Sequence, residues 1–82
     1  MSNAMPTNPG QELVVKLQDQ GKVIVIFHMK GCGHCEELIN LVKAKNMLHM
    51  VVLVDCNEYG DISKSNQITG TPTSVLVDKK NN

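Results

Sequence analysis

The chain has 82 residues and a mass of 9.0 kDa, which allows one domain with a small core. Hydrophobic residues make up 41%, too many for a disordered chain, and eight acidic side chains balance eight basic ones. All the basic residues are Lys, and Phe27 and Tyr59 are the only aromatic residues. A neutral chain without Arg lacks the charge and the stacking rings by which proteins hold nucleic acids, so we expect no nucleic-acid partner.

The ends of the chain and its longest apolar runs bear on location. No apolar run reaches the 18 or so residues of a membrane span, so we expect no membrane partner. Residues 1–4 read as an expression scar, and residues 5–82, from a native start at Met5, as a single domain. No secretory signal is visible and the three cysteines cannot form an even disulfide framework, so we expect a cytoplasmic protein.

Helices and strands alternate along the predicted domain. In chain order we expect a helix opened by Asn8 and ended by Gly21, a strand at 23–27, a helix from 32 to 45, a strand at 50–54, a weak helix within 59–67 capped by Asp61, and a strand at 74–77. The first two strands are continuously apolar and β-branched, which is typical of strands buried on both faces. This alternation predicts an α/β fold whose first two strands run parallel.

Cys32 and Cys35, separated by Gly33 and His34, form a Cys-x-x-Cys pattern between a strand and a helix. A cysteine at a helix N-terminus lies near unpaired N–H groups and the positive end of the helix dipole, which favour its reactive thiolate. We therefore expect Cys32 to be the catalytic nucleophile. Cys35, one turn later, would close a disulfide with it and resolve mixed disulfides. Gly33 and His34 would tune the pair, His34 as a second stabiliser of the thiolate.

A metal site is the alternative use of the same cysteines. Zinc needs four ligands, and without a second Cys pair only His28, His34 and His49 could supplement Cys32 and Cys35. A non-enzymatic metal-binding module and a redox-incompetent fragment are therefore the competing interpretations. We expect neither a metal nor an organic cofactor.

The strand, the Cys-Gly-His-Cys tetrad and the turn at 70–73 together resemble the thioredoxin superfamily. The tetrad is similar to the active-site sequence of protein disulfide isomerases, and Pro72 looks like the family's cis-proline. The resemblance implies a thioredoxin-like three-layer sandwich with three visible strands, the first two parallel and the third antiparallel. It also implies a protein-disulfide oxidoreductase working through a mixed disulfide, with Thr71 and Pro72 binding protein disulfide substrates and a partner dithiol exchanging the electrons.

Departures from the family pattern are visible as well. Ile26 stands where thioredoxins carry a buried Asp, the strand at 50–54 has no Lys, and Gly31 replaces the Trp before the first cysteine. The family continues after the third strand with a further strand and a helix, so we expect a C-terminally truncated version of the fold. The open edge of the third strand predicts a weak homodimer.

Overall fold

The computed structural model describes residues 8–81, so the interpretation of residues 1–4 as an expression scar lies outside the described residues. In chain order the elements are α1 (Pro9–Gln20), β1 (Lys22–His28), α2 (Gly33–Ala44), the 3-10 helix η1 (Leu48–Met50), β2 (Val51–Asp55), α3 (Gly60–Ser65), β3 (Thr73–Asp78) and the 3-10 helix η2 (Lys79–Asn81). The expected alternation of helices and strands is confirmed.

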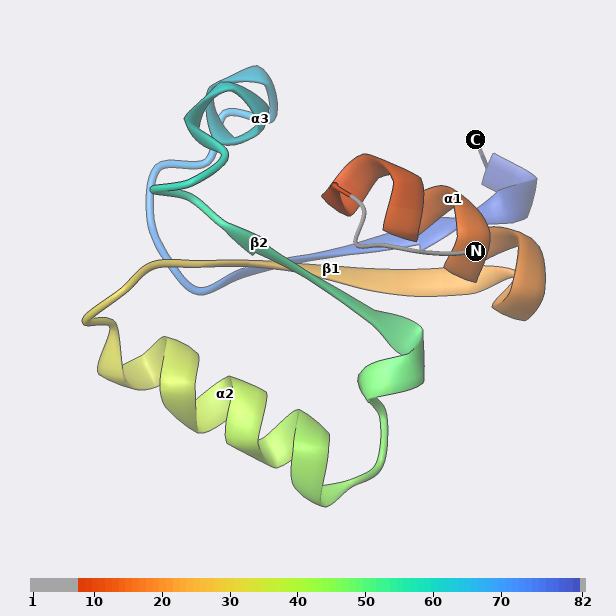
Figure 1. Cartoon of the computed structure of the whole chain (residues 1–82), viewed down its shortest axis with the longest axis horizontal. Helices are drawn as coiled ribbons and strands as arrows, with labels where there is room; N and C mark the ends of the chain where they lie inside the picture. The colour runs from red at the N-terminus through yellow and green to blue at the C-terminus, as the bar shows by residue number, and fades with distance from the viewer. Residues whose placement is uncertain (1–7, 82) are drawn as a thin grey trace, which may run out of the picture.

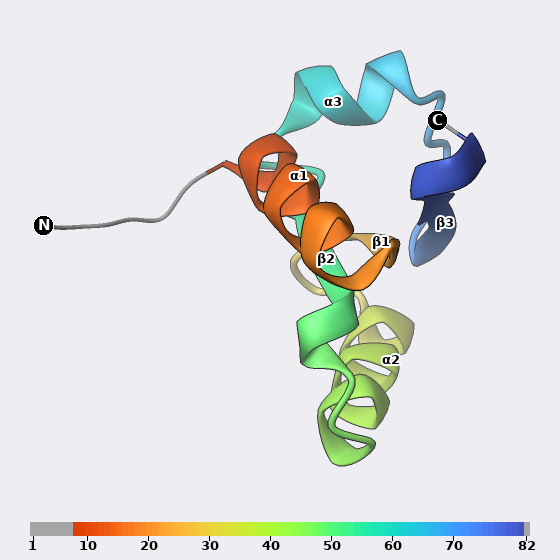
Figure 2. The same cartoon turned by 90° about the vertical axis from the view of Figure 1, so that its right-hand side faces the viewer.

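The three strands form one sheet in the order β2-β1-β3. β1 pairs with β2 in parallel and with β3 antiparallel, as the resemblance implied. Figures 1 and 2 show α1 and α3 on one face of the sheet and α2 on the other, so the chain has three layers. The predicted thioredoxin-like α/β fold is confirmed.

Helix α1 begins and ends where the sequence indicates. The Asn8 side chain accepts from the Gln11 N–H at 2.9 Å, and the Gln11 side chain accepts from the Asn8 N–H, which completes a capping box. Gly21 ends the helix with a φ of 81°, a left-handed conformation that glycine adopts without steric cost. These two local signals fix the length of the helix that covers one face of the sheet.

The core lies on both faces of β1. Val23, Val25 and Phe27 form one cluster with Val52 and Val54 of β2, all 7% exposed or less. Ile26 is also buried, 1% exposed, and its side chain points to the opposite face because successive residues of a strand alternate. This agrees with the expectation that the central strand is buried on both sides.

Two details of the local structure differ from the sequence prediction. Met50 lies in η1 and not in β2, because a 3-10 turn precedes the strand. The weak helix is α3, but its N-cap is Tyr59, without a side-chain hydrogen bond, and Asp61 lies inside its first turn. The prediction that Asp61 caps this helix was therefore wrong. The helix starts earlier, so Asp61 lies in the first turn, where its negative charge is near the positive end of the helix dipole.

No helix among residues 8–81 is both long enough and apolar enough to cross a membrane.

Candidate active site

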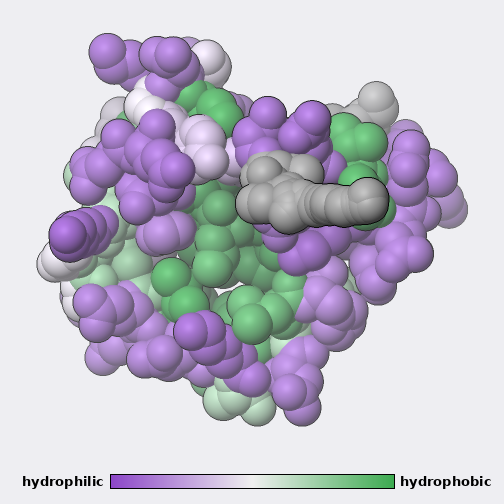
Figure 3. All heavy atoms as spheres, viewed as in Figure 1, coloured by the Kyte–Doolittle hydropathy of each residue, from purple (hydrophilic) through white to green (hydrophobic). Residues whose placement is uncertain are grey.

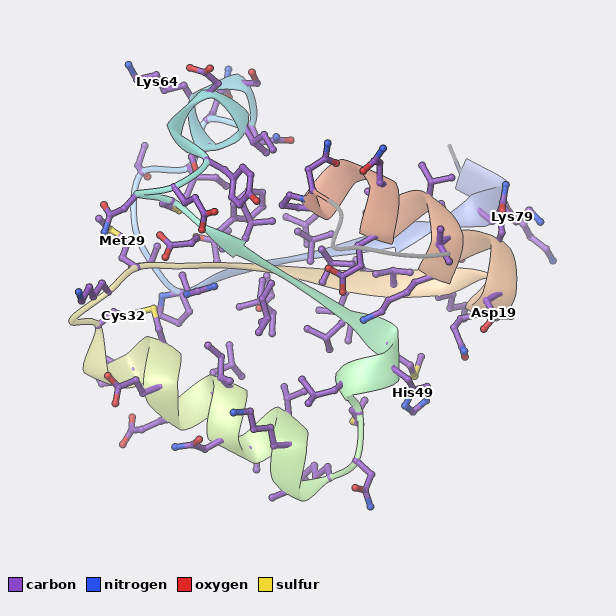
Figure 4. All side chains as sticks on the ribbon, viewed as in Figure 1. Asp19, Met29, Cys32, His49, Lys64 and Lys79 are labelled. Carbon is purple, nitrogen blue, oxygen red and sulfur yellow. A yellow bond between two sulfur atoms is a disulfide. The ribbon has the colours of Figure 1, made fainter. Side chains whose placement is uncertain are left out.

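The candidate active site lies at the edge of the sheet where β1 and β2 both end. The two strands are parallel, so the loops that follow them leave from the same edge. The Cys56 N–H donates to the His28 carbonyl oxygen at 2.8 Å, which links the residue after β2 to the last residue of β1. Figure 4 shows Met29 and Cys32 at this end of the molecule, with Lys79, Asp19 and His49 at the far end.

A tight turn connects β1 to α2. The Cys32 N–H donates to the Met29 carbonyl oxygen at 3.3 Å, and Gly31 has a φ of 82°. This left-handed position favours glycine, which gives a structural reason for Gly31 where the family commonly carries Trp. The turn delivers Cys32 directly to the start of α2.

Cys32 is the N-cap residue of α2, and its sulfur accepts from the Cys35 N–H at 3.1 Å. A disulfide joins Cys32 to Cys35, with their Cα atoms 5.2 Å apart. Cys35 is buried, at 1% exposed, whereas Cys32 is half-buried and Gly33 between them is exposed. The two sulfurs are therefore unequal: solvent and large molecules reach Cys32 before they reach Cys35.

The loop before β3 brings Thr71 and Pro72 to the disulfide. The peptide bond between these two residues is cis. The Thr71 carbonyl oxygen lies 3.8 Å from Cys32 Sγ, across 39 residues of sequence. The Thr73 hydroxyl donates to the Gly70 carbonyl oxygen at 2.5 Å and closes the loop on itself. The residues expected to bind substrate thus lie beside the residue expected to attack it.

His34 lies on the outer side of α2. Its Nδ1 is 3.2 Å from Glu37 Oε1, and the two side chains are 88% and 79% exposed. In residues 8–81 no hydrogen bond or ion pair connects its imidazole to Cys32 or Cys35. The contact with Glu37 was not foreseen, although spacing of three residues on a helix was a visible signal for it.

The buried acid that thioredoxins place behind the redox pair is replaced by an apolar side chain. Ile26, at the matching position of β1, is 1% exposed and has no group that could carry a proton. Glu36 and Glu37, in α2, are both exposed. If Glu36 or Glu37 exchanges a proton with Cys35, the proton therefore passes through solvent.

The remaining candidate ligands do not converge. Among the described residues no group of three or more His, Cys, Asp or Glu side chains is arranged to hold a metal ion. Cys56 is a free thiol, partly buried, and packs against the cluster of core valines. Partial burial and the neighbouring Glu58 raise the pKa of Tyr59 above its ordinary value.

A family model for thioredoxin matches residues 7–82. The chain belongs to the thioredoxin family. No curated protein sequence matches it. Membership in this family together with the disulfide between Cys32 and Cys35 supports thiol-disulfide redox chemistry at a general level.

Solved structures similar to this chain are thioredoxin domains. The first thioredoxin domain of mouse protein disulfide-isomerase A4 is 20% identical with a TM-score of 0.63, and the match covers 89% of this chain and 56% of that one. A chain from a structure on thiol resolving in yeast mitochondrial 1-Cys peroxiredoxin via glutathione/thioredoxin systems is 23% identical, with a TM-score of 0.56 and coverages of 92% and 72%. The first two thioredoxin domains of Saccharomyces cerevisiae Eps1p give 20% identity and a TM-score of 0.54, over 95% of this chain and 32% of that one. These identities support the fold. The chain spans about half the length of the mouse domain.

Proposed function

We propose that this protein is a thiol-disulfide oxidoreductase that exchanges electrons with protein disulfides through a mixed-disulfide intermediate. The observation that carries the proposal is the unequal exposure of the two cysteines: Cys32 is accessible at a helix N-terminus and Cys35 is buried behind it. An accessible sulfur suits attack on a large substrate. A buried neighbour within bonding distance suits intramolecular resolution.

The reaction begins from the reduced pair. The Cys32 thiolate attacks one sulfur of the substrate disulfide, a Cys32–substrate bond forms, and the other substrate sulfur leaves as a thiolate that takes a proton from water. Cys35 then loses its proton and attacks Cys32 Sγ, which releases the second substrate thiolate. Two electrons pass to the substrate, and the Cys32–Cys35 disulfide remains. A partner dithiol reduces it again, or the same steps run in reverse and oxidise a substrate dithiol.

The start of α2 supplies the stabilisation that the nucleophile needs. The Cys35 N–H, which lies 3.1 Å from Cys32 Sγ, can donate to the thiolate as it does to the disulfide sulfur. The helix dipole adds partial positive charge at the same place. A hydrogen bond to a charged acceptor is worth about 1.5–3 kcal/mol and one to a neutral acceptor about 0.5–1.5 kcal/mol, so this N–H favours the reduced, thiolate form by the difference between the two.

Thr71 and Pro72 are the proposed substrate-binding residues. Family resemblance assigns the backbone of the residue before the cis-proline to pairing with an extended peptide. Here the Thr71 carbonyl lies beside Cys32 Sγ, so a peptide bound at Thr71 would present its disulfide to the nucleophile. Backbone pairing of this kind tolerates many sequences, which suits protein disulfides as a substrate class.

A cytoplasmic location is part of the same proposal. So is weak self-association, which the open edge of β3 supports. The Lys79 N–H donates to the Gly21 carbonyl oxygen at 2.9 Å, which continues the β1–β3 pairing. Hydrogen-bonding direction alternates along an antiparallel strand, so the backbone groups of Ser74 and Leu76 face the open edge. A second copy can pair there antiparallel about Leu76.

Trapping the intermediate tests the redox function. We expect reduced Cys35→Ser protein, in a Cys56→Ser background, to form a stable mixed disulfide with insulin whose disulfides are intact. Cys32 attacks a disulfide of insulin, and no second thiol resolves the product. The matched Cys32→Ser protein should form none, since its remaining thiol is buried. Non-reducing electrophoresis and intact mass measure both adducts. Equal trapping by the two variants, or no trapping by either, would contradict the assignment of Cys32 as nucleophile.

A further inference from the structure

His34 and Glu37 form a side-chain pair on the exposed side of α2 that the redox mechanism above does not use. The pair joins His34 Nδ1 to Glu37 Oε1 at 3.2 Å. Of the two ring nitrogens, Nδ1 is the one this contact engages, and the ring is 88% exposed. The position of the imidazole is therefore set by the carboxylate of Glu37 and not by packing.

The contact engages the imidazole with Glu37 and not with the nucleophile: among residues 8–81, Cys32 Sγ is hydrogen-bonded to backbone groups of Thr71 and Cys35. Cys32 caps the N-terminus of α2, and Glu37 lies five residues further along. At a rise of about 1.5 Å per residue, the carboxylate is anchored about 7.5 Å along the helix axis from the cap. An imidazole whose Nδ1 is engaged by Glu37 is not free to turn that nitrogen toward Cys32 Sγ.

We propose that Glu37 is a positioning residue that weakens the effect of His34 on the redox balance of the Cys32–Cys35 pair. This inference rests on the proposed oxidoreductase function. A protonated imidazole near Cys32 favours its thiolate, and hence the reduced form. Glu37 limits this in two ways: it engages the ring at Nδ1, and its negative charge offsets the positive charge of the imidazolium. The dithiol is consequently a stronger reductant than the Cys-Gly-His-Cys sequence alone would make it.

Glu36 provides a matched control. It is the preceding residue of α2, carries the same charge and is also exposed. Within residues 8–81 no hydrogen bond or ion pair joins Glu36 to His34. Replacing either acid with Gln removes one negative charge near the helix N-terminus, whereas only the replacement of Glu37 releases the imidazole.

Equilibration with glutathione redox buffers at pH 7 tests the proposal, with the fraction of Cys32–Cys35 disulfide measured by intact mass after alkylation. We expect Glu37→Gln to lower the equilibrium constant for oxidation of the dithiol about two- to fourfold more than Glu36→Gln does, the range typical of exposed ion pairs. In a His34→Gln background the two substitutions should change the constant by equal factors.

Three results would overturn the proposal. Equal effects of the two Gln substitutions with His34 present would show that Glu37 acts only as a charge. An excess effect of Glu37→Gln that survives in the His34→Gln background would show that it acts without the imidazole. A wild-type protein that never equilibrates with glutathione would overturn the oxidoreductase function itself, and this proposal with it.

Discussion

The two strands that flank β1 are made of the same kinds of residue but have different surroundings. In β2, Val51, Val52 and Val54 are each 2% exposed or less. In β3, Val75 is 41% exposed and Leu76 is 63% exposed. A run of β-branched and aliphatic residues therefore specifies a strand without specifying its burial, which depends on what packs against each face.

The difference follows from where the helices lie. Helix α1 reaches the β2 side of the sheet, where the Lys16 ammonium donates to the carbonyl oxygens of Leu48 and Val51 at 3.1 and 2.8 Å. Between α1 and α3, an apolar groove of about 140 Å³ remains over the sheet, lined by side chains that include Leu13, Ile62 and Val75. Figure 3 shows apolar side chains at the centre of the molecular surface, between hydrophilic side chains.

The largest effect should come from truncating one valine on each side of β1. We expect Val52→Ala to lower the free energy of unfolding by about 2 kcal/mol, because it removes two fully buried methyl groups and leaves a cavity. Val75→Ala should cost less than about 1 kcal/mol, since its methyl groups are already partly hydrated. Urea unfolding of both variants measures the difference. Equal losses would show that β3 is as well covered as β2.

A smaller effect should follow from cutting the link between α1 and the start of β2. Lys16→Met leaves two carbonyl oxygens without their charged donor and Glu12 without its ion-pair partner at 2.8 Å, so we expect a loss of about 1 kcal/mol. Lys64→Met, at an exposed helical lysine on α3, is the control and should change the free energy of unfolding by less than about 0.5 kcal/mol. Indistinguishable urea midpoints would mean that Lys16 does not hold β2 in place.

The smallest effect on stability should come from the open edge of β3. Leu76→Lys should change the free energy of unfolding by less than about 0.5 kcal/mol, because the side chain is exposed. It should nevertheless abolish self-association, since pairing about Leu76 would bring two like charges together. Val15→Lys introduces the same charge at a position on α1 that is also 63% exposed, and should associate like the wild type.

Sedimentation across a wide concentration range separates these outcomes. A wild-type protein that stays monomeric throughout, or a Leu76→Lys variant that associates as the wild type does, would rule out the β3 edge as the contact between copies.

Predictions from sequence were most accurate where a few neighbouring residues decide the outcome. The capping box of Asn8 and Gln11, the left-handed Gly21 and the disulfide between Cys32 and Cys35 all depend on spacings of five residues or fewer, or on a single backbone conformation. The prediction that Asp61 caps α3 was wrong because a helix of six residues has few local signals that mark its start. The helix begins at Gly60.

The alternation of elements, the parallel pair of apolar strands and the cysteine pair at the start of a helix could be predicted from the sequence, because hydrophobic periodicity, capping and helical spacing act between near neighbours. The accessibility of Cys32, the burial of Cys35, the approach of Thr71 to within 3.8 Å of Cys32 Sγ, and the cover over β2 that β3 lacks became visible in the folded chain. These depend on contacts between residues far apart in the chain, such as the 39 positions from Cys32 to Thr71. No local pattern encodes which distant segments will cover a given face or edge.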